Sequence, residues 1–128
     1  MVQKITAGVS IKVESFYLQE QSNPINSEYF FAYRITMENL TNMPVKLLSR
    51  YWNIIDSNGT KRIVEGEGVI GQQPVLQAND SYQYTSACNL RTELGKMFGN
   101  YIFLNLYDKS TFEVTIPEFA LIAPAKLN

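Results

Sequence analysis

The chain has 128 residues, of which 45% are hydrophobic, and 11 basic and 12 acidic side chains give a formal net charge of −1. This size fits one domain spanning residues 1–128, and the near-neutral charge argues against a broad electrostatic grip on nucleic acid or an anionic membrane. The sequence contains no histidine. It therefore excludes, within one chain, an enzyme built on a nucleophile–imidazole pair or a zinc site with histidine ligands.

Two further features bear on location and redox state. Residues 1–6 carry no apolar segment behind their charge, and no apolar run approaches the roughly 18–20 residues that a spanning helix needs. We therefore expect a cytoplasmic protein without a signal peptide. Cys88 is the only cysteine, so it cannot form a disulfide within the chain. We expect it to act as a small buried hydrophobe.

The first half of the chain reads as strands separated by turns. Alternating apolar and polar residues predict strands over 9–17 and 29–38, because successive side chains of a strand point to opposite faces. A third strand is expected over 45–56. Asn58-Gly59 then predicts a hairpin, since both residues tolerate positive φ, and 61–65 is the returning strand.

The second half continues the same pattern. The expected elements are a glycine-rich loop over 66–74, a strand over 81–88, a loop over 90–99, a hairpin of 101–107 and 111–116 that ends at Pro117, and a short last strand within 119–128. Seven or eight short strands without a long helical periodicity predict an all-β protein. The expected architecture is an antiparallel sandwich of two sheets.

A glycine motif lies within the predicted loop over 66–74. Gly66, Gly68 and Gly71 have the spacing of the dinucleotide-binding fingerprint. That fingerprint needs a following helix, which Pro74 disfavours, and a βαβ unit, which the pattern lacks. Two interpretations remain open. The backbone amides of the glycines and Gln72 could cradle a phosphate group, or the glycines could simply allow positive φ and close backbone approach at the rim of the sandwich.

Arg50 and Trp52 lie two residues apart in a predicted strand, so they share one face. Arginine and tryptophan are enriched at binding hot spots, so the pair is a candidate recognition patch. The alternative is a core tryptophan beside a structural arginine. An inward arginine would need a partner, for which Glu65 or Glu67 is a candidate.

An apolar set in the predicted loop over 90–99 and just beyond it is the second candidate for partner binding. Met97, Phe98 and Tyr101 flank two glycines. An exposed apolar loop with glycine hinges would suit a protein partner, whereas the alternative is that these side chains cap one end of the sandwich. We expect this segment and the loop over 66–74 to form one end of the molecule together.

An ordered set of short motifs extends over nearly the whole chain. It comprises Arg50-Tyr51-Trp52, Asn58-Gly59, the run from Val64 to Pro74, Tyr84-Thr85-Ser86, the run from Gly95 to Tyr101, the run from Ile116 to Leu121, Pro124 and Leu127-Asn128. This combination resembles the ApaG family. The resemblance implies a fibronectin type III-like, immunoglobulin-like β-sandwich. Tyr51 stands where many members carry histidine, which weakens any metal-binding role at that position.

The resemblance also implies a function. Domains of this family look like protein-interaction modules, no enzymatic activity is established for them, and bacterial members have been linked to cobalt tolerance and magnesium efflux. We therefore expect a non-enzymatic binding module with an unidentified protein partner and with no cofactor, metal, nucleic acid or membrane partner. The alternative is a protein that binds a small phosphate ligand or nucleotide through Gly66, Gly68 and Gly71. The sequence does not choose between a monomer and a weak homodimer.

Overall fold

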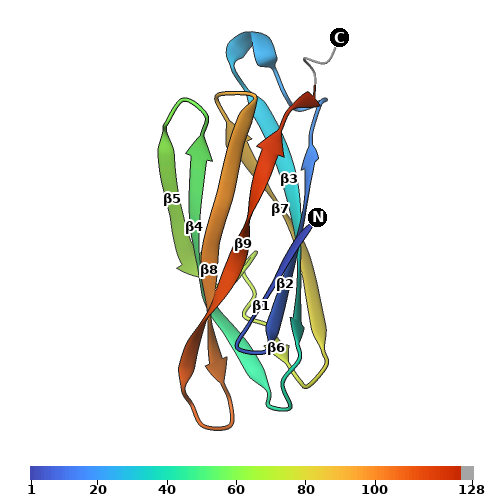
Figure 1. The fold of residues 1–128 in the computed structure, drawn as a ribbon, viewed down its shortest axis with the longest axis vertical. Helices are drawn as coiled ribbons and strands as arrows, with labels where there is room; N and C mark the ends of the chain where they lie inside the picture. Colours follow the sequence, from blue (N-terminus) through green and yellow to red (C-terminus); the bar gives the residue numbers. More distant parts are fainter. Residues whose placement is uncertain (125–128) are drawn as a thin grey trace.

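The computed structural model describes residues 1–124 and shows two antiparallel β-sheets packed face to face (Figure 1). The first sheet has the order β1-β2-β3-β7, formed by β1 (Val2–Thr6), β2 (Val9–Tyr17), β3 (Tyr29–Asn39) and β7 (Ser81–Leu90). The second has the order β5-β4-β8-β9, formed by β5 (Lys61–Glu67), β4 (Val45–Asp56), β8 (Leu94–Asn105) and β9 (Thr111–Ile122), and β6 (Val75–Leu76) also pairs with β4. A 3₁₀ turn, η1 (Pro24–Asn26), lies in the connection between β2 and β3.

The predicted all-β, fibronectin type III-like sandwich is confirmed, with nine strands among the described residues in place of seven or eight. Both predicted hairpins are present, since β4 pairs with β5 across Asn58-Gly59, and β8 pairs with β9. The strand β1 was not predicted, because Gln3 and Lys4 interrupt its apolar pattern and remain exposed. It forms because its backbone pairs with β2 from Val2 to Thr6.

The predicted loop over 90–99 is wrong, because β8 already begins at Leu94. The glycines that suggested a loop instead allow strands to approach closely. A Cβ atom at Gly99 would lie 1.9 Å from the carbonyl oxygen of Tyr51 on β4, so no larger residue fits there without moving a backbone. Glycine in this segment therefore marks close packing between strands rather than a flexible connection.

Pro117 was expected to end the last hairpin, and this prediction is also wrong because β9 continues to Ile122. The pairing shifts at this point: Gly99 lies opposite Ile116, but Met97 lies opposite Phe119. Two residues of β9, Pro117 among them, therefore face one residue of β8. A bulge of this kind tolerates proline, since it leaves ladder positions unpaired. The rest of the expected last strand, residues 125–128, lies outside the described residues.

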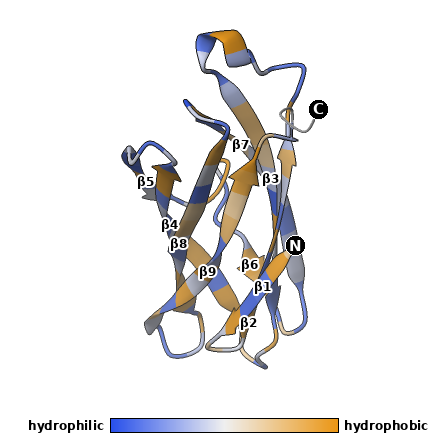
Figure 2. Ribbon diagram, turned by 45° about the horizontal axis from the view of Figure 1, so that its top comes forward, coloured by the Kyte–Doolittle hydropathy of each residue, from blue (hydrophilic) through white to orange (hydrophobic). Residues whose placement is uncertain are grey.

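The core lies between the two sheets. Alternate residues of β3 are buried, as predicted, and Figure 2 shows apolar and polar segments alternating along the strands. Trp52 is 2% exposed and lies at the centre of an aromatic cluster, with ring centroids 5.3 Å from Tyr33, 5.9 Å from Phe119 and 6.5 Å from Tyr101. Cys88 is buried, which confirms its predicted role as a small core residue.

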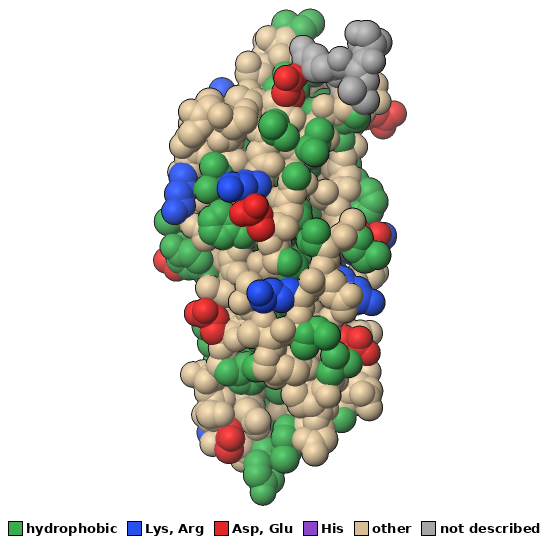
Figure 3. All heavy atoms as spheres, in the orientation of Figure 1, with side chains coloured by type: hydrophobic (Ala, Val, Ile, Leu, Met, Phe, Trp, Pro, Cys, Tyr) green, Lys and Arg blue, Asp and Glu red, His purple; other side chains and the backbone are tan. Residues whose placement is uncertain are grey.

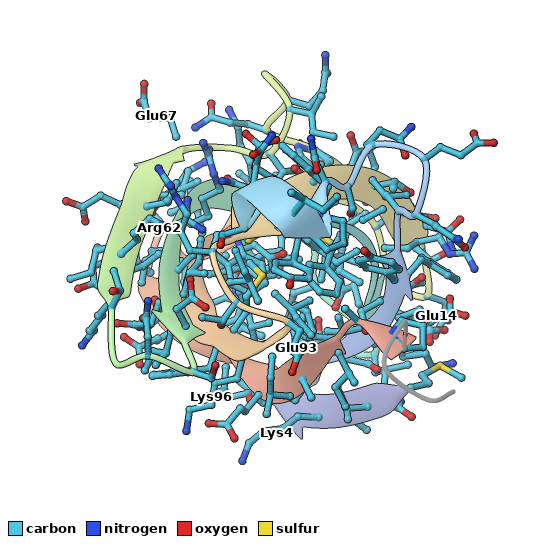
Figure 4. All side chains as sticks on the ribbon, turned by 90° about the horizontal axis from the view of Figure 1, so that it is seen from above. Lys4, Glu14, Arg62, Glu67, Glu93 and Lys96 are labelled. Carbon is cyan, nitrogen blue, oxygen red and sulfur yellow. The ribbon has the colours of Figure 1, made fainter. Side chains whose placement is uncertain are left out.

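The two lateral sides of the sandwich differ. On the first, which we call the closed side, β9 lies against β1 and β2, and Figure 4 shows these strands together. The backbone N–H of Thr115 donates to the hydroxyl of Thr6, and the Ser15 hydroxyl donates to the carbonyl of Ala120, each at 3.3 Å. On the second, the open side, β5 and β7 are the edges of the two sheets. There Arg62 reaches from β5 to the carbonyl oxygen of Asn89 on β7.

Candidate functional site

The glycine motif is built onto a bulge in β4. Pairing between β4 and β8 shifts at Leu48, and the carbonyl oxygen of this residue accepts two hydrogen bonds at 2.9 Å, from the Gly68 amide and from the Gln73 side chain. Gly68 has φ +63°, and a Cβ atom there would lie 2.2 Å from the Gln72 carbonyl oxygen. Only glycine therefore fits this turn, and the loop packs on β4 instead of projecting into solvent.

The same geometry bears on the predicted phosphate cradle. The amide of Gly68 donates to Leu48, and the amide of Gln72 donates to the carbonyl oxygen of Val69 at 2.9 Å. Gly66 lies inside β5, paired with Arg50, and is not part of the loop. Two of the four predicted amide donors are thus already used within the protein. The arrangement fits the second interpretation from sequence, in which the glycines allow positive φ and close backbone approach. Phosphate binding by this loop stays a prediction.

Arg50 is half-buried and lies across Gly66. A Cβ atom at Gly66 would be 3.2 Å from both terminal nitrogens of the guanidinium group, so the missing side chain makes room for it. One of these nitrogens donates to the carbonyl oxygens of Glu67, at 3.1 Å, and Gly68, at 2.8 Å. The partners are therefore backbone carbonyls, not the carboxylates of Glu65 or Glu67 that the sequence suggested. Carbonyl oxygens hold the side chain in place, and no carboxylate of the described residues lies within 4.0 Å of its guanidinium group.

The apolar set proposed for partner binding is mostly core. Met97 is 1% exposed and Tyr101 is fully buried, so neither side chain can contact a partner in the folded protein. Phe98 is half-buried and points to the outer face of the second sheet. The prediction that this segment and the glycine loop together form one end of the molecule is also wrong, because residues 95–101 belong to strand β8. Residues 95–101 run along β4 from Asp56 to Arg50, whereas the glycine loop packs at Leu48.

Buried tyrosines lie close to Arg50. The hydroxyl oxygens of Tyr84 and Tyr101 are 2.5 Å apart and share a hydrogen bond. Burial raises the pKa of both phenols and that of Tyr33, and the Arg50 charge offsets part of this rise. Burial likewise raises the pKa of the Cys88 thiol, partly offset by Arg62. At neutral pH these four groups are uncharged and leave the two arginine charges in place.

A cavity of about 200 Å³ opens between the two sheets on the open side. Strands β4 and β5 supply one wall and β3 and β7 the other. Its polar lining residues are Tyr33, Arg50, Trp52, Arg62, Ser86 and Asn89. The Arg62 guanidinium lies 3.7 Å from the sulfur of Cys88, and Arg62 also lines a neighbouring hollow with Asp56 and Arg91. Figure 4 labels Arg62 on the side where β5 lies.

The indole N–H of Trp52 is buried and has no hydrogen-bond acceptor among the described residues. Buried donors in folded proteins are nearly always paired with protein or water. Of the two interpretations of Trp52 from sequence, the core one is correct, but sequence reasoning missed the unpaired donor on the ring. Sequence reasoning also missed Arg62, which pairs with Ile54 on β4, because only the packed sheets bring this side chain into a cavity that Arg50 and Trp52 also line.

Residues 1–124 lack two other features on which protein functions depend. No group of three histidine, cysteine, aspartate or glutamate side chains there is arranged to hold a metal ion. None of the helical segments there has the length and apolar character needed to cross a membrane. Figure 3 shows basic and acidic side chains interspersed on one face of the molecule.

The fold and the site together define a fibronectin type III-like β-sandwich domain with a polar, arginine-lined cavity between the edges of its two sheets. The family model for the ApaG domain matches residues 19–105. The chain belongs to the ApaG family.

Curated relatives extend this match over nearly the whole chain. Protein ApaG of Sinorhizobium fredii is 44% identical over 124 residues, covering 97% of this chain and 95% of the relative. Protein ApaG of Brucella canis is 45% identical with the same coverage. The crystal structure of the putative ApaA protein from Bordetella pertussis superposes with a TM-score of 0.88 at 38% identity, covering 91% of this chain and 94% of that one. The curated relatives are named without any enzymatic activity.

Proposed function

We propose that this chain is a non-enzymatic binding module that engages a protein partner through the edge of β5. The observation that carries the proposal is the exposure of this strand. Every residue of β5 except Gly66 is exposed, including Ile63 at 52% and Val64 at 40%. An exposed edge strand presents unpaired backbone N–H and C=O groups, and proteins usually protect such an edge unless another strand adds to it.

The outer face beside this edge supports the same function. In the pairing of the second sheet, Ile63 lies opposite Asn53, which lies opposite Phe98. Directly paired residues project to the same face, so the exposed isoleucine and the half-buried phenylalanine lie on one outward row. A strand added to β5 would extend the sheet, with an apolar side chain next to Ile63. Phe98 is thus the one residue of the apolar set proposed from sequence that remains a candidate, and it lies on the outer face.

Capture experiments with two isoleucine variants test the proposal. Ile63 on β5 and Ile5 on β1 are 52% and 54% exposed, and both lie on edge strands, one in each sheet. Ile63→Asp should abolish retention of a protein that the immobilised wild-type chain captures from source cells, because a charge would oppose strand addition. Ile5→Asp should retain it. Equal retention by both variants would show that the β5 edge does not bind the partner.

The family's link to cobalt tolerance and magnesium efflux remains a prediction for this chain. The route we propose is indirect, through the protein partner, because the sequence lacks histidine, a usual cobalt ligand. The phosphate-ligand alternative is tested by titrating pyrophosphate into labelled protein. Shifts of the Gly66, Gly68 and Gly71 amides would support it, whereas unchanged shifts at millimolar pyrophosphate would remove it.

A further inference from the structure

We propose that the cavity on the open side is a binding site for a single oxyanion group, a carboxylate or a phosphate, held by the guanidinium groups of Arg50 and Arg62, with Trp52 in the cavity wall. These three side chains come from adjacent strands: Arg50 and Trp52 from β4, and Arg62 from β5. The site adjoins the glycine loop, because Arg50 donates to the Gly68 carbonyl oxygen, but its donors are side chains and not the amides of that loop. The β5 edge can bind a partner whether or not the cavity binds an anion.

The charge balance of the cavity supports an anionic ligand. Within residues 1–124, ion pairs involve Arg34 with Glu14 and Lys96 with Glu118, and neither cavity arginine has a carboxylate within 4.0 Å. Asp56 lines the neighbouring hollow, but its two oxygens accept hydrogen bonds from the Arg91 amide and the Thr92 hydroxyl.

The remaining titratable groups of the cavity do not neutralise its arginines. Burial raises the pKa of the Tyr33 phenol and of the Cys88 thiol, so both are uncharged at neutral pH. Two guanidinium groups therefore line one partly enclosed space, and no carboxylate of the described residues lies within 4.0 Å of either. Placing like charges in such a space is unfavourable unless an anion lies between them.

The donor geometry and the volume restrict the class of ligand. Arg50 uses one terminal nitrogen on the carbonyls of Glu67 and Gly68, and its other terminal nitrogen has no hydrogen-bond acceptor among the described residues. Trp52 lines the same cavity, but its indole N–H, which is unpaired among the described residues, is buried beyond reach of solvent, so the two arginines supply the donors. The cavity, at about 200 Å³, is smaller than the roughly 300–1,000 Å³ of most small-molecule sites. It suits one carboxylate or phosphate group and is too small for a nucleotide.

The single tryptophan of the chain gives a direct readout, because Trp52 contributes the only indole N–H signal to the spectrum. Uniformly ¹⁵N-labelled protein is titrated with inorganic phosphate and, separately, with sodium acetate, with sodium chloride holding the ionic strength constant. We expect the indole N–H resonance to shift and to saturate with at least one of the two anions. Saturation with acetate alone indicates a carboxylate, as on an acidic side chain of a partner; saturation with phosphate indicates a phosphoryl ligand.

Two arginine variants serve as a matched pair. Arg62→Gln should weaken binding about tenfold, the effect of losing one charged hydrogen bond. Arg34→Gln removes the same charge from a side chain paired with Glu14 and should leave binding unchanged. An indole resonance that does not move with either anion, or equal binding by the two variants, overturns the proposal. A partner captured through β5 would be unaffected by either result, so the two proposals can fail separately.

Discussion

The two sheets are connected in different ways on the closed and the open side of the sandwich. On the closed side, β9 lies against β1 and β2, and hydrogen bonds such as that from Thr115 to Thr6 connect the sheets. On the open side, β5 and β7 are bridged through the flexible side chain of Arg62. Where backbones meet, the fold is fixed by sterics and hydrogen bonds. Where a charged side chain forms the bridge, a polar cavity remains and a ligand can enter.

The largest difference in stability should be found between alanine variants of two glycines in the second sheet. A Cβ atom at Gly99 would lie 1.9 Å from the backbone oxygen of Tyr51, whereas one at Gly66 would lie 3.2 Å from the mobile end of Arg50. Gly99→Ala should therefore lower the free energy of unfolding by about 3 kcal/mol, and Gly66→Ala should change it by no more than about 1 kcal/mol. Urea unfolding measures both. Equal losses would mean that the β4–β8 contact is no tighter than the open side.

Alkaline pH probes whether water reaches the phenols from the open side. Burial raises the pKa of Tyr33, Tyr84 and Tyr101 above the ordinary value of 10.0. The unfolded chain ionises these groups near pH 10, while the folded protein keeps them neutral, so their contribution to stability is complete below pH 10 and is lost as the pH rises toward the folded pKa. The free energy of unfolding should fall by about 1.4 kcal/mol per pH unit for each protected phenol.

Urea unfolding at pH 9, 10 and 11 follows this loss, and absorbance at 295 nm follows phenol ionisation in the folded protein. Tyr84→Phe should reduce the slope above pH 10 by the contribution of one phenol. If all the phenols of the native protein ionise near pH 10, the open side hydrates the tyrosine cluster. The interior would then be less enclosed than the burial of Tyr101 indicates.

The smallest expected effects on stability come from the two contacts that join the sheets, Thr6 with Thr115 on the closed side and Arg62 with Asn89 on the open side. Thr6→Val keeps the side-chain shape but removes the acceptor of the Thr115 amide, and should cost about 1 kcal/mol. Arg62→Ala on the open side should change the free energy of unfolding by less than about 0.5 kcal/mol, because the side chain is exposed. It should instead raise the pKa of the Cys88 thiol further, because Arg62 lies 3.7 Å from the sulfur and its charge favours the thiolate. The pH dependence of the reaction of Cys88 with a thiol reagent measures this pKa, and an unchanged pH dependence would show that Arg62 does not act on Cys88.

Much of this fold could be predicted from local patterns. The alternation in β3 predicted its buried face, and Asn58-Gly59 predicted the β4–β5 hairpin, because both signals depend on residues close in sequence. The errors at residues 90–99 and at Pro117 have a common cause. Glycine and proline usually interrupt strands, but here the approach of β4 to Gly99 and a bulge beside Met97 accommodate them. Such accommodations depend on the neighbouring strand, which the local sequence does not specify.

The candidate site was predicted less completely than the fold. Arg50 and Phe98 were singled out and lie near the open side and its outer face, but Met97 and Tyr101 were assigned to a surface and are core. Their burial could not be deduced while β8 was taken for a loop, since side-chain direction depends on strand register. Arg62 carried no sequence signal at all, because a lone arginine in an edge strand is ordinary.

The sequence by itself determined the class of fold, the absence of histidine chemistry and the family of the chain, because composition, alternation and motif order are properties of the linear chain. Tertiary structure alone decided which side of the sandwich stays open. It also decided which residues line the cavity there, where Arg50 and Trp52 come from β4 and Arg62, paired with Ile54, comes from β5. These contacts join residues from different strands, so they exist only after the two sheets have packed.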